Sequence, residues 1–218
     1  MLSLTGEVSM QCEVAGGTAW GEPASTVTSL AFVIAGIALW LTRGRRPDGG
    51  ARPGVQAAVA VLAVLIGLGS VVQHGPSPWW NPVVHDPPLM ALLALVAADG
   101  VADLTQRRLR AWWWLVPGAV CAVLAFWRPG WSAAAQGVAA AAAVGITLLR
   151  AWRRPALRRH LLPGLVLLGL GGAIGTMTRP GWPWCAPDSW LQGHAVWHVL
   201  AAVTIVVLAP ALGARSLR

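Results

Sequence analysis

Long apolar stretches, separated by short segments in which arginines gather, restrict the fold of this chain more than any other feature. Each stretch approaches the roughly 20 residues that span the hydrocarbon core of a bilayer. Only 11% of the 218 residues are charged and 56% are hydrophobic, whereas soluble domains carry about a quarter of charged residues. The sequence therefore predicts an all-α membrane protein in which residues 1–218 form one domain. The stretches run near Pro23–Thr42, Gly54–Gln73, Pro87–Leu104, Ala111–Trp127, Ser132–Leu149, Leu161–Thr178 and Gln192–Gly213.

The arginines predict how these stretches cross the membrane. All sixteen basic residues are arginine, and fourteen of them follow the first, third, fifth or seventh stretch. Only Arg128 and Arg179 follow an even-numbered stretch. Because cytoplasmic loops carry the excess of basic residues, we expect a seven-transmembrane helix bundle with the N-terminus outside and the C-terminus in the cytoplasm. The net charge of +8 does not indicate nucleic-acid binding, since no basic patch is interleaved with aromatic residues.

Two histidines in the last stretch, His194 and His198 in "GHAVWHVLAA", are four residues apart. On a helix this spacing places both imidazoles on one face, one turn apart. Such a pair can bind one zinc ion, although a catalytic zinc site has a third protein ligand. Alternatively, both are interfacial histidines that form hydrogen bonds to neighbouring groups or lipid headgroups.

Further polar residues fall at the same predicted depth. The second stretch ends "GLGSVVQHG", which places Ser70 and His74 on one helical face, and Asp86 follows at the entrance to the third stretch. Ionisable groups inside a membrane are costly unless they are paired or bind a metal, so a functional site is the default interpretation. The alternatives are that Asp86 caps a helix beginning at Pro87 and that Ser70 is a packing residue. His85 is a rival to its neighbour Asp86 as a residue of this site, although Asp86 fits such a site better.

The order of these motifs resembles the alkaline ceramidase family, a branch of the CREST superfamily of seven-helix membrane hydrolases that also includes the adiponectin and progestin receptors. The resemblance extends over nearly the whole chain through "GSVVQHG", the Asp before "PPLM", and "GHAVWH". It implies a zinc ion held by His74, His194 and His198. It also implies a water molecule that forms hydrogen bonds with Asp86 and Ser70.

The resemblance further implies hydrolysis of an amide bond in ceramide or a related N-acyl lipid. Three neutral imidazoles leave the zinc its positive charge, which makes a water molecule more acidic. Asp86 is then the expected general base, and Ser70 an expected oxyanion donor. The alternative function is a seven-transmembrane receptor or stress sensor with a structural zinc site. A transporter is a weaker alternative, suggested only by Asp99 and Asp103, for which pairing with arginine is the competing explanation.

The N-terminal segment extends the resemblance. Glu13 and Glu22 match two acids of a calcium-binding segment in the family, whereas Met10 and Ala15 stand where further ligands would fall. Calcium takes six to eight oxygen ligands, so a charge at a helix N-terminus is the alternative role for Glu22.

The cysteines and the overall composition complete the predictions. The family has a disulfide comparable to a Cys12–Cys185 bridge, which would lie on the outer side, while Cys121 is expected to be a packing residue. Many Ala, Gly and Arg residues and no Lys suggest a GC-rich genome. We therefore expect a bacterial cytoplasmic membrane, with the zinc site towards its outer face.

Overall fold

The computed structural model describes residues 8–14, 20–43 and 52–214. These residues form seven α-helices and two 3₁₀ helices, without a β-strand. Six of the helical segments are long and apolar enough to cross a membrane, and α4 is a shorter apolar helix. The predicted all-α, multi-pass membrane protein is therefore confirmed. The elements are α1 (Pro23–Thr42), α2 (Pro53–His74), α3 (Asn81–Leu104), α4 (Trp112–Trp127), α5 (Pro129–Arg153), η1 (Pro155–Leu157), α6 (Arg158–Met177), α7 (Gly193–Leu208) and η2 (Ala209–Ala211).

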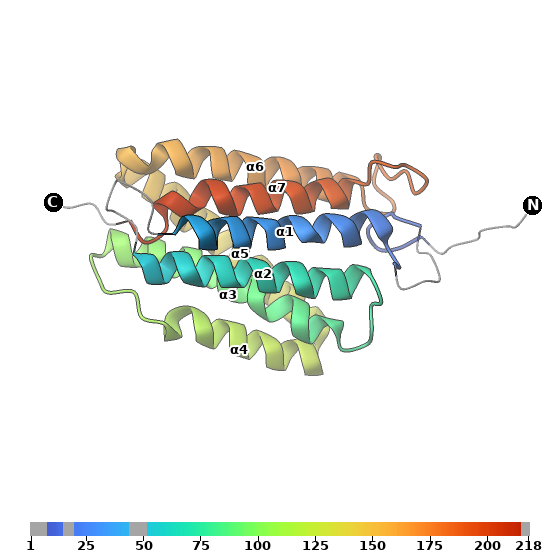
Figure 1. Ribbon diagram of the computed structural model, residues 1–218, viewed down its shortest axis with the longest axis horizontal. Coiled ribbons are helices and arrows are strands. Elements are labelled where there is room, and N and C mark those ends of the chain that lie inside the picture. The colour runs from blue at the N-terminus through green and yellow to red at the C-terminus, as the bar shows by residue number, and fades with distance from the viewer. Residues whose placement is uncertain (1–7, 15–19, 44–51, 215–218) are drawn as a thin grey trace, which may run out of the picture.

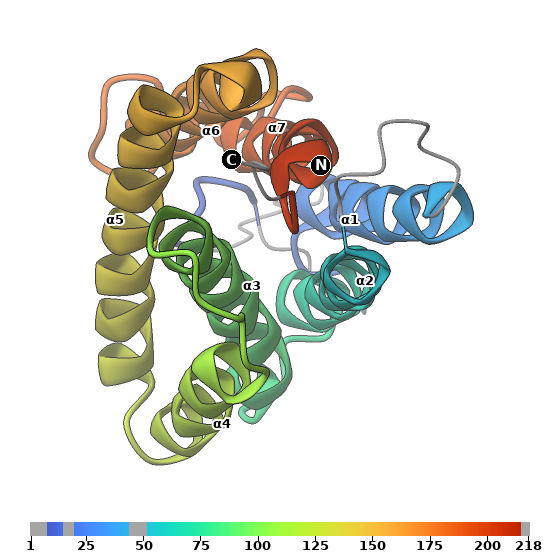
Figure 2. The same cartoon turned by 90° about the vertical axis from the view of Figure 1, so that its left-hand side faces the viewer.

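The helices lie side by side in one bundle (Figure 1). α1 packs against α2 and α7, α2 against α3, α3 against α4 and α5, and α6 against α7. Viewed from one end, α5 runs at an incline from beside α6 to beside α4 (Figure 2). The last turn of α2 and the first turns of α1, α3 and α7 gather at the right-hand end of the bundle in Figure 1. Polar residues far apart in the sequence therefore share one end of the molecule.

Most helices begin within a few residues of the predicted positions, and a proline occupies the first turn of α1, α2 and α5. Proline suits this position since its missing N–H would have no helical partner there. The predicted start of the third span at Pro87 is wrong, because α3 begins at Asn81 and holds Pro87 and Pro88 in its interior. Packed membrane helices tolerate internal proline where neighbouring groups satisfy the freed carbonyls. Asp86 therefore lies inside α3 and does not cap it.

Glycines allow the helices to approach closely. A Cβ atom at Gly36 of α1 would lie 2.6 Å from the carbonyl oxygen of Ala60 in α2. Gly171 and Gly175 of α6 make room for the ring of Trp197, since a Cβ atom at Gly171 would lie 2.8 Å from that ring. Small residues bring membrane helices together through van der Waals packing, which is the main attraction available in lipid. These contacts hold α1 and α7, which carry much of the polar site, in place.

A buried ion cluster closes the other end of the bundle. Arg150 of α5 bonds Asp99 and Asp103 of α3, each at 2.9 Å, and all three side chains are at most 2% exposed. Arg150 also donates to the carbonyl oxygen of Ala214, and the Gly213 N–H donates to Asp99. The two aspartates are thus paired with arginine, as the competing explanation held. They therefore no longer support the alternative of a transporter.

Removal of the Arg150 side chain is expected to destabilise the fold strongly. Arg150→Ala leaves two buried carboxylates without their partner, and breaking a buried ion pair in this way costs about 3–5 kcal/mol. Arg153→Ala, on the exposed side of the same helix, is the matched control and should change stability by about 0.5 kcal/mol or less. Unfolding of purified protein in a detergent titration measures both. Equal stability of the two variants would contradict a structural role for the cluster.

Candidate metal centre

Three histidines from two helices meet at one end of the bundle. His74 is the last residue of α2, and His194 and His198 lie on the first two turns of α7. One potential ligand atom from each lies within 4.8 Å of the others, and the ring centroids are 4.5 to 4.9 Å apart. His74 and His198 are each 3% exposed. The predicted convergence of these residues, and their capacity to hold a metal ion, are confirmed.

The ends of α2 and α7 determine where the three imidazoles lie. α2 ends at His74, where the Gly75 N–H still bonds the carbonyl oxygen of Val71. α7 begins at Gly193, where a Cβ atom would lie 2.1 Å from the hydroxyl oxygen of Thr178. Only glycine fits at this close approach, which positions the first turn of α7 and thus His194. The spacing of four residues then places His198 one turn further along the same face.

Glu22, directly before α1, and the backbone of α1 orient two of the imidazoles. Nδ1 of His74 bonds the Glu22 carboxylate, and Nδ1 of His198 lies 3.1 Å from the Ser25 carbonyl oxygen. Because a carbonyl oxygen only accepts hydrogen bonds, Nδ1 of His198 must carry the proton. The same tautomer suits His74 beside a carboxylate. Nε2 of both rings is then left with its lone pair, which is the usual arrangement of a metal-binding histidine and its hydrogen-bond partner.

Glu22 is therefore a residue whose role the sequence did not predict. Its position directly before α1 suggested a charge at the helix N-terminus or a calcium ligand, yet it contacts His74 from the adjacent helix. The acid that bonds the start of α1 is Glu13, which accepts from the N–H groups of Ala24 and Ser25 at 2.5 and 3.1 Å. The only available signal was the presence of two acids near a predicted helix start.

Both acids of the implied calcium site have protein partners in the structure, and their role in calcium binding stays a prediction. Both carboxylate oxygens of Glu13 accept hydrogen bonds from α1, including one from the Ser25 hydroxyl at 2.8 Å. Glu22 is engaged with His74. These partners use part of the acceptor capacity of the two carboxylates, which are two of the six to eight oxygen ligands that calcium takes. Ala15, considered with this site, lies outside the described residues.

Asp86 is close to this end of the bundle but is not part of the histidine group. Its Oδ1 lies 2.8 Å from Nδ1 of His85, and its Oδ2 accepts from the Ser132 hydroxyl of α5 at 2.6 Å. A Cβ atom at Gly69 of α2 would lie 2.8 Å from the Cα of His85, so the turn that carries Asp86 crosses α2 beside Ser70. His85 partners Asp86 and is not placed with the ligands. The role of Asp86 as general base stays a prediction.

Ser70 lies in a chain of hydroxyl groups between α2 and α7. Its Oγ is 2.8 Å from that of Ser29, and the Ser29 hydroxyl donates to the Ser25 carbonyl oxygen at 2.7 Å. Because a serine has one hydroxyl proton, Ser70 is the donor to Ser29. Ser29 in turn lies 3.5 Å from Nδ1 of His198. The predicted oxyanion role of Ser70 requires its hydroxyl to turn away from Ser29, and it stays a prediction.

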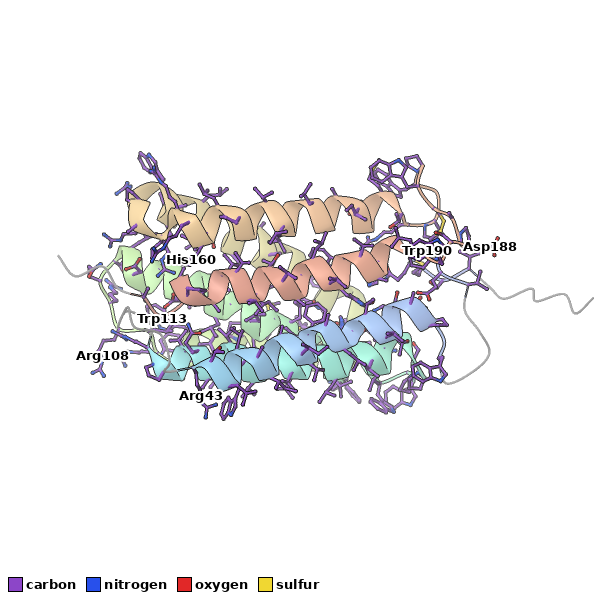
Figure 3. The ribbon with its side chains drawn as sticks, turned by 45° about the horizontal axis from the view of Figure 1, so that its top comes forward. Arg43, Arg108, Trp113, His160, Asp188 and Trp190 are labelled. Carbon is purple, nitrogen blue, oxygen red and sulfur yellow. A yellow bond between two sulfur atoms is a disulfide. The ribbon has the colours of Figure 1, made fainter. Side chains whose placement is uncertain are left out.

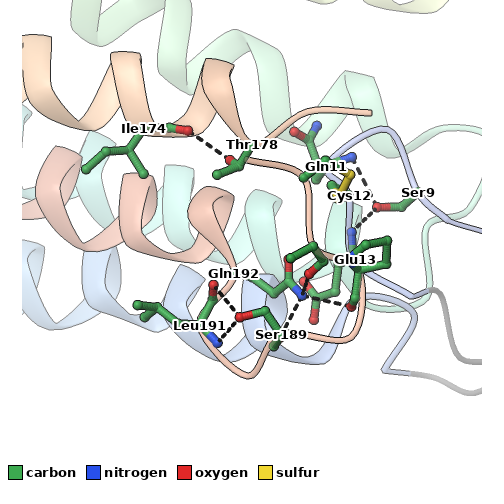
Figure 4. Close-up of a disulfide and its surroundings, with 12 residues drawn as sticks. Ser9, Gln11, Cys12, Glu13, Ile174, Thr178, Ser189, Leu191 and Gln192 are labelled. Atoms are coloured by element: carbon green, nitrogen blue, oxygen red, sulfur yellow. Dashed lines mark hydrogen bonds between the residues drawn. A yellow bond between two sulfur atoms is a disulfide. The ribbon is translucent and has the colours of Figure 1, made fainter. Parts of the chain in front are cut away.

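A disulfide joins Cys12 to Cys185 beside this site, with the Cα atoms 5.7 Å apart. Figure 4 shows the bond among Ser9, Glu13 and Gln192. Cys121 is free and buried, and its sulfur contacts the Ser132 hydroxyl at 3.2 Å. The disulfide implied by the resemblance and the packing role of Cys121 are both present in the structure.

An apolar groove of about 560 Å³ runs between α1 and α7. Its walls include Val27 and Thr28 of α1 and Val199 of α7. Thr28 also lies 3.2 Å from Nδ1 of His198 through its hydroxyl oxygen. Thr28 therefore connects the groove wall with His198, while none of the three histidines lines the groove.

Neither a protein-family model nor a curated protein matches this chain. The function must therefore be argued from the site and from the sequence motifs.

Proposed function

We propose that this chain is a zinc-dependent membrane hydrolase of the alkaline ceramidase family. In this proposal it cleaves the amide bond of a membrane lipid, giving a free fatty acid and an amine. The observation that carries the proposal is the group of three histidines, two of which have Nδ1 bonded to Glu22, directly before α1, and to the Ser25 carbonyl oxygen. Three nitrogen ligands with an open fourth position are typical of catalytic zinc sites, whereas structural sites have four protein ligands.

Each residue has a distinct task in the proposed reaction. His74, His194 and His198 hold the zinc, and Glu22 and the Ser25 carbonyl group fix the orientation of two of the rings. Bound zinc supplies a Lewis acid that polarises the amide carbonyl group and makes water more acidic. Asp86 takes a proton from the attacking water and passes it to the departing amine nitrogen. Water thus supplies OH to the acyl carbon and H to the amine as the C–N bond breaks.

The substrate class follows from the location of the histidines. They lie at the ends of helices long enough to cross a bilayer, so the site lies near the headgroups, where the amide of an N-acyl lipid is found. The adjacent apolar groove is lined by side chains such as Val27 and Val199, which suit an acyl chain. Ceramide is the substrate that the family resemblance suggests, and other N-acyl lipids have the same chemistry.

The proposed topology has seven crossings, namely the six long apolar helical segments and the shorter helix α4. Its 16 residues extend about 24 Å, somewhat less than the roughly 30 Å of the hydrocarbon core. Exposed Trp112 and Trp127 at its two ends suit the two interfaces, and local thinning of the bilayer accommodates a short span.

The arginine distribution supports the proposed orientation. Arg43 and Arg108 lie at the end of the bundle opposite Asp188 and Trp190 (Figure 3). The arginine-rich end is cytoplasmic by the positive-inside rule, which places the histidines towards the outer face of a bacterial cytoplasmic membrane. Four of the arginines used in this argument, Arg45, Arg46, Arg215 and Arg218, lie outside the described residues.

The proposal predicts metal-dependent release of fatty acid. Purified protein in lipid vesicles is supplied with ceramide and with a panel of other N-acyl lipids, and free fatty acid is measured. Release should stop after the metal is removed with a chelator and resume when zinc is added. If metal-loaded protein releases no fatty acid from any lipid amide, the hydrolase is excluded and the receptor with a structural zinc site becomes the better explanation.

A further inference from the structure

Residues 8–14 form a small closed loop that is tied covalently to the other side of the site. The Ser9 hydroxyl accepts from the N–H groups of Gln11 and Glu13, and Val8 pairs with Val14 across the loop. Cys12 is buried and has a φ of 63°, a backbone conformation that residues other than glycine rarely adopt. Its disulfide to Cys185 fixes the loop against the segment that precedes α7.

Cys12, one of the two disulfide-bonded cysteines, is connected to the metal centre by its neighbour Glu13. This residue directly follows Cys12, is 5% exposed, and accepts three hydrogen bonds from Ala24 and Ser25. A carboxylate at a helix N-terminus satisfies free N–H groups and interacts favourably with the helix dipole. The same turn of α1 presents the Ser25 carbonyl oxygen to His198. Only one residue, Glu13, therefore stands between Cys12 and Ser25, whose carbonyl oxygen bonds the ligand His198.

Cys185, the other cysteine, is connected to the same site by the segment that precedes α7. Cys185 begins the segment that enters this helix, and Gln192 holds the segment by donating to the carbonyl oxygens of Ala186, Pro187 and Ser189 at 2.7 to 3.3 Å. His194 follows two residues later. Figure 4 shows Gln192 and Glu13 in the surroundings of the bond. The disulfide thus joins the loop of residues 8–14, which acts on His198 through Glu13 and α1, to the segment that positions the start of α7 and His194.

We propose that the Cys12–Cys185 disulfide is a redox switch on metal retention, which holds Glu13 on α1 and thereby keeps the Ser25 carbonyl oxygen, the hydrogen-bond partner of His198, in place. The inference rests on the proposed metal site. A dithiol reductant outside the membrane transfers two electrons and two protons to the bond, giving two cysteine thiols, and is itself oxidised to a disulfide. Cys185 is partly exposed and so provides the sulfur that the reductant attacks. The released loop then no longer holds Glu13 against α1, and the metal dissociates faster.

The test compares zinc release from oxidised and reduced protein. Purified zinc-loaded protein is mixed with a chromophoric chelator, with or without a phosphine reductant, which is chosen because dithiols bind zinc themselves. Loss of an outer partner of a metal-binding histidine typically weakens metal affinity about 10- to 100-fold. We therefore expect zinc release to be about tenfold faster after reduction, with the number of new thiols measured in parallel.

Three variants separate the disulfide from other effects of the reductant. Cys12→Ser with Cys185→Ser should release zinc at the fast rate without reductant and show no further response to it. Cys121→Ala keeps the disulfide and should respond as wild type. Glu13→Gln should release zinc faster while still oxidised, and reduction should then add little, because both changes act on the same contact.

A second readout does not depend on the metal. Reduction of metal-free protein should accelerate hydrogen exchange at the amides of Ala24 and Ser25, which the Glu13 carboxylate protects. Equal zinc release by oxidised and reduced protein, or unchanged exchange at these amides, overturns the switch. Oxidised protein that binds no zinc overturns the proposed function instead, and the exchange measurement still decides whether the disulfide holds Glu13 on α1.

Discussion

Purified protein should contain about one zinc ion per chain, and His198→Ala should lose it. His198 is one of only three nitrogen ligands in the group, and it is the one whose Nδ1 is oriented by the backbone of α1. Its removal leaves two imidazoles, which is fewer protein ligands than catalytic zinc sites use. Elemental analysis of protein purified without chelators, followed by a competition titration, gives both stoichiometry and affinity.

Two further variants calibrate this result. His85→Ala removes a histidine at the same end of the bundle that is not in the ligand group, so it should keep the full zinc content. Glu22→Gln weakens the partner of His74 without removing a ligand, and it should lower the affinity by about 10- to 100-fold. Full zinc occupancy in a chain with His74, His194 and His198 all changed to alanine would exclude the proposed site.

Periodic and local features allowed much of the bundle to be predicted from the sequence. Apolar length alone located all seven helices, because a bilayer imposes nearly the same span on each of them. The spacing of His194 and His198 determined that they share a helical face. The depth of His74 then followed from its place at the end of the second span. These predictions depend on one segment at a time, or on one membrane plane that all segments share.

Contacts between segments could not be predicted in this way. Glu22 contacts His74 and Glu13 bonds α1, and both partnerships join segments whose packing against each other no local pattern in the sequence reveals. The start of α3 was misplaced for a related reason. Pro87 and Pro88 are typical of a helix start. Contacts with neighbouring helices nevertheless allow α3 to continue past both prolines. Tertiary packing overrides such local signals.

Asp86→Asn should abolish turnover while leaving the fold and the zinc in place. The amide has nearly the shape of the carboxylate, and both partners of Asp86 can adapt to it. The Ser132 hydroxyl can rotate to accept from an amide N–H, and His85 can present either tautomer. Since Asp86 is outside the ligand group, metal content should remain near one ion per chain. An amide cannot take the proton from the attacking water, and such acid–base assistance is worth about 10²- to 10⁴-fold in rate.

The expected result is therefore at least about a hundredfold slower release of fatty acid by Asp86→Asn. Ser70→Ala should have a smaller effect, since the Ser70 hydroxyl donates to Ser29 and must turn before it can stabilise an oxyanion beside a divalent cation. Ser132→Ala is the matched control, because it removes a hydrogen-bond donor to Asp86 but keeps the carboxylate, and it should retain most of the rate. If Asp86→Asn releases fatty acid as fast as wild type at equal zinc content, Asp86 is not the base. The proton must then be taken by another group at this end of the bundle, for which His85, bonded to Asp86 at 2.8 Å, and Glu22, bonded to His74, are candidates.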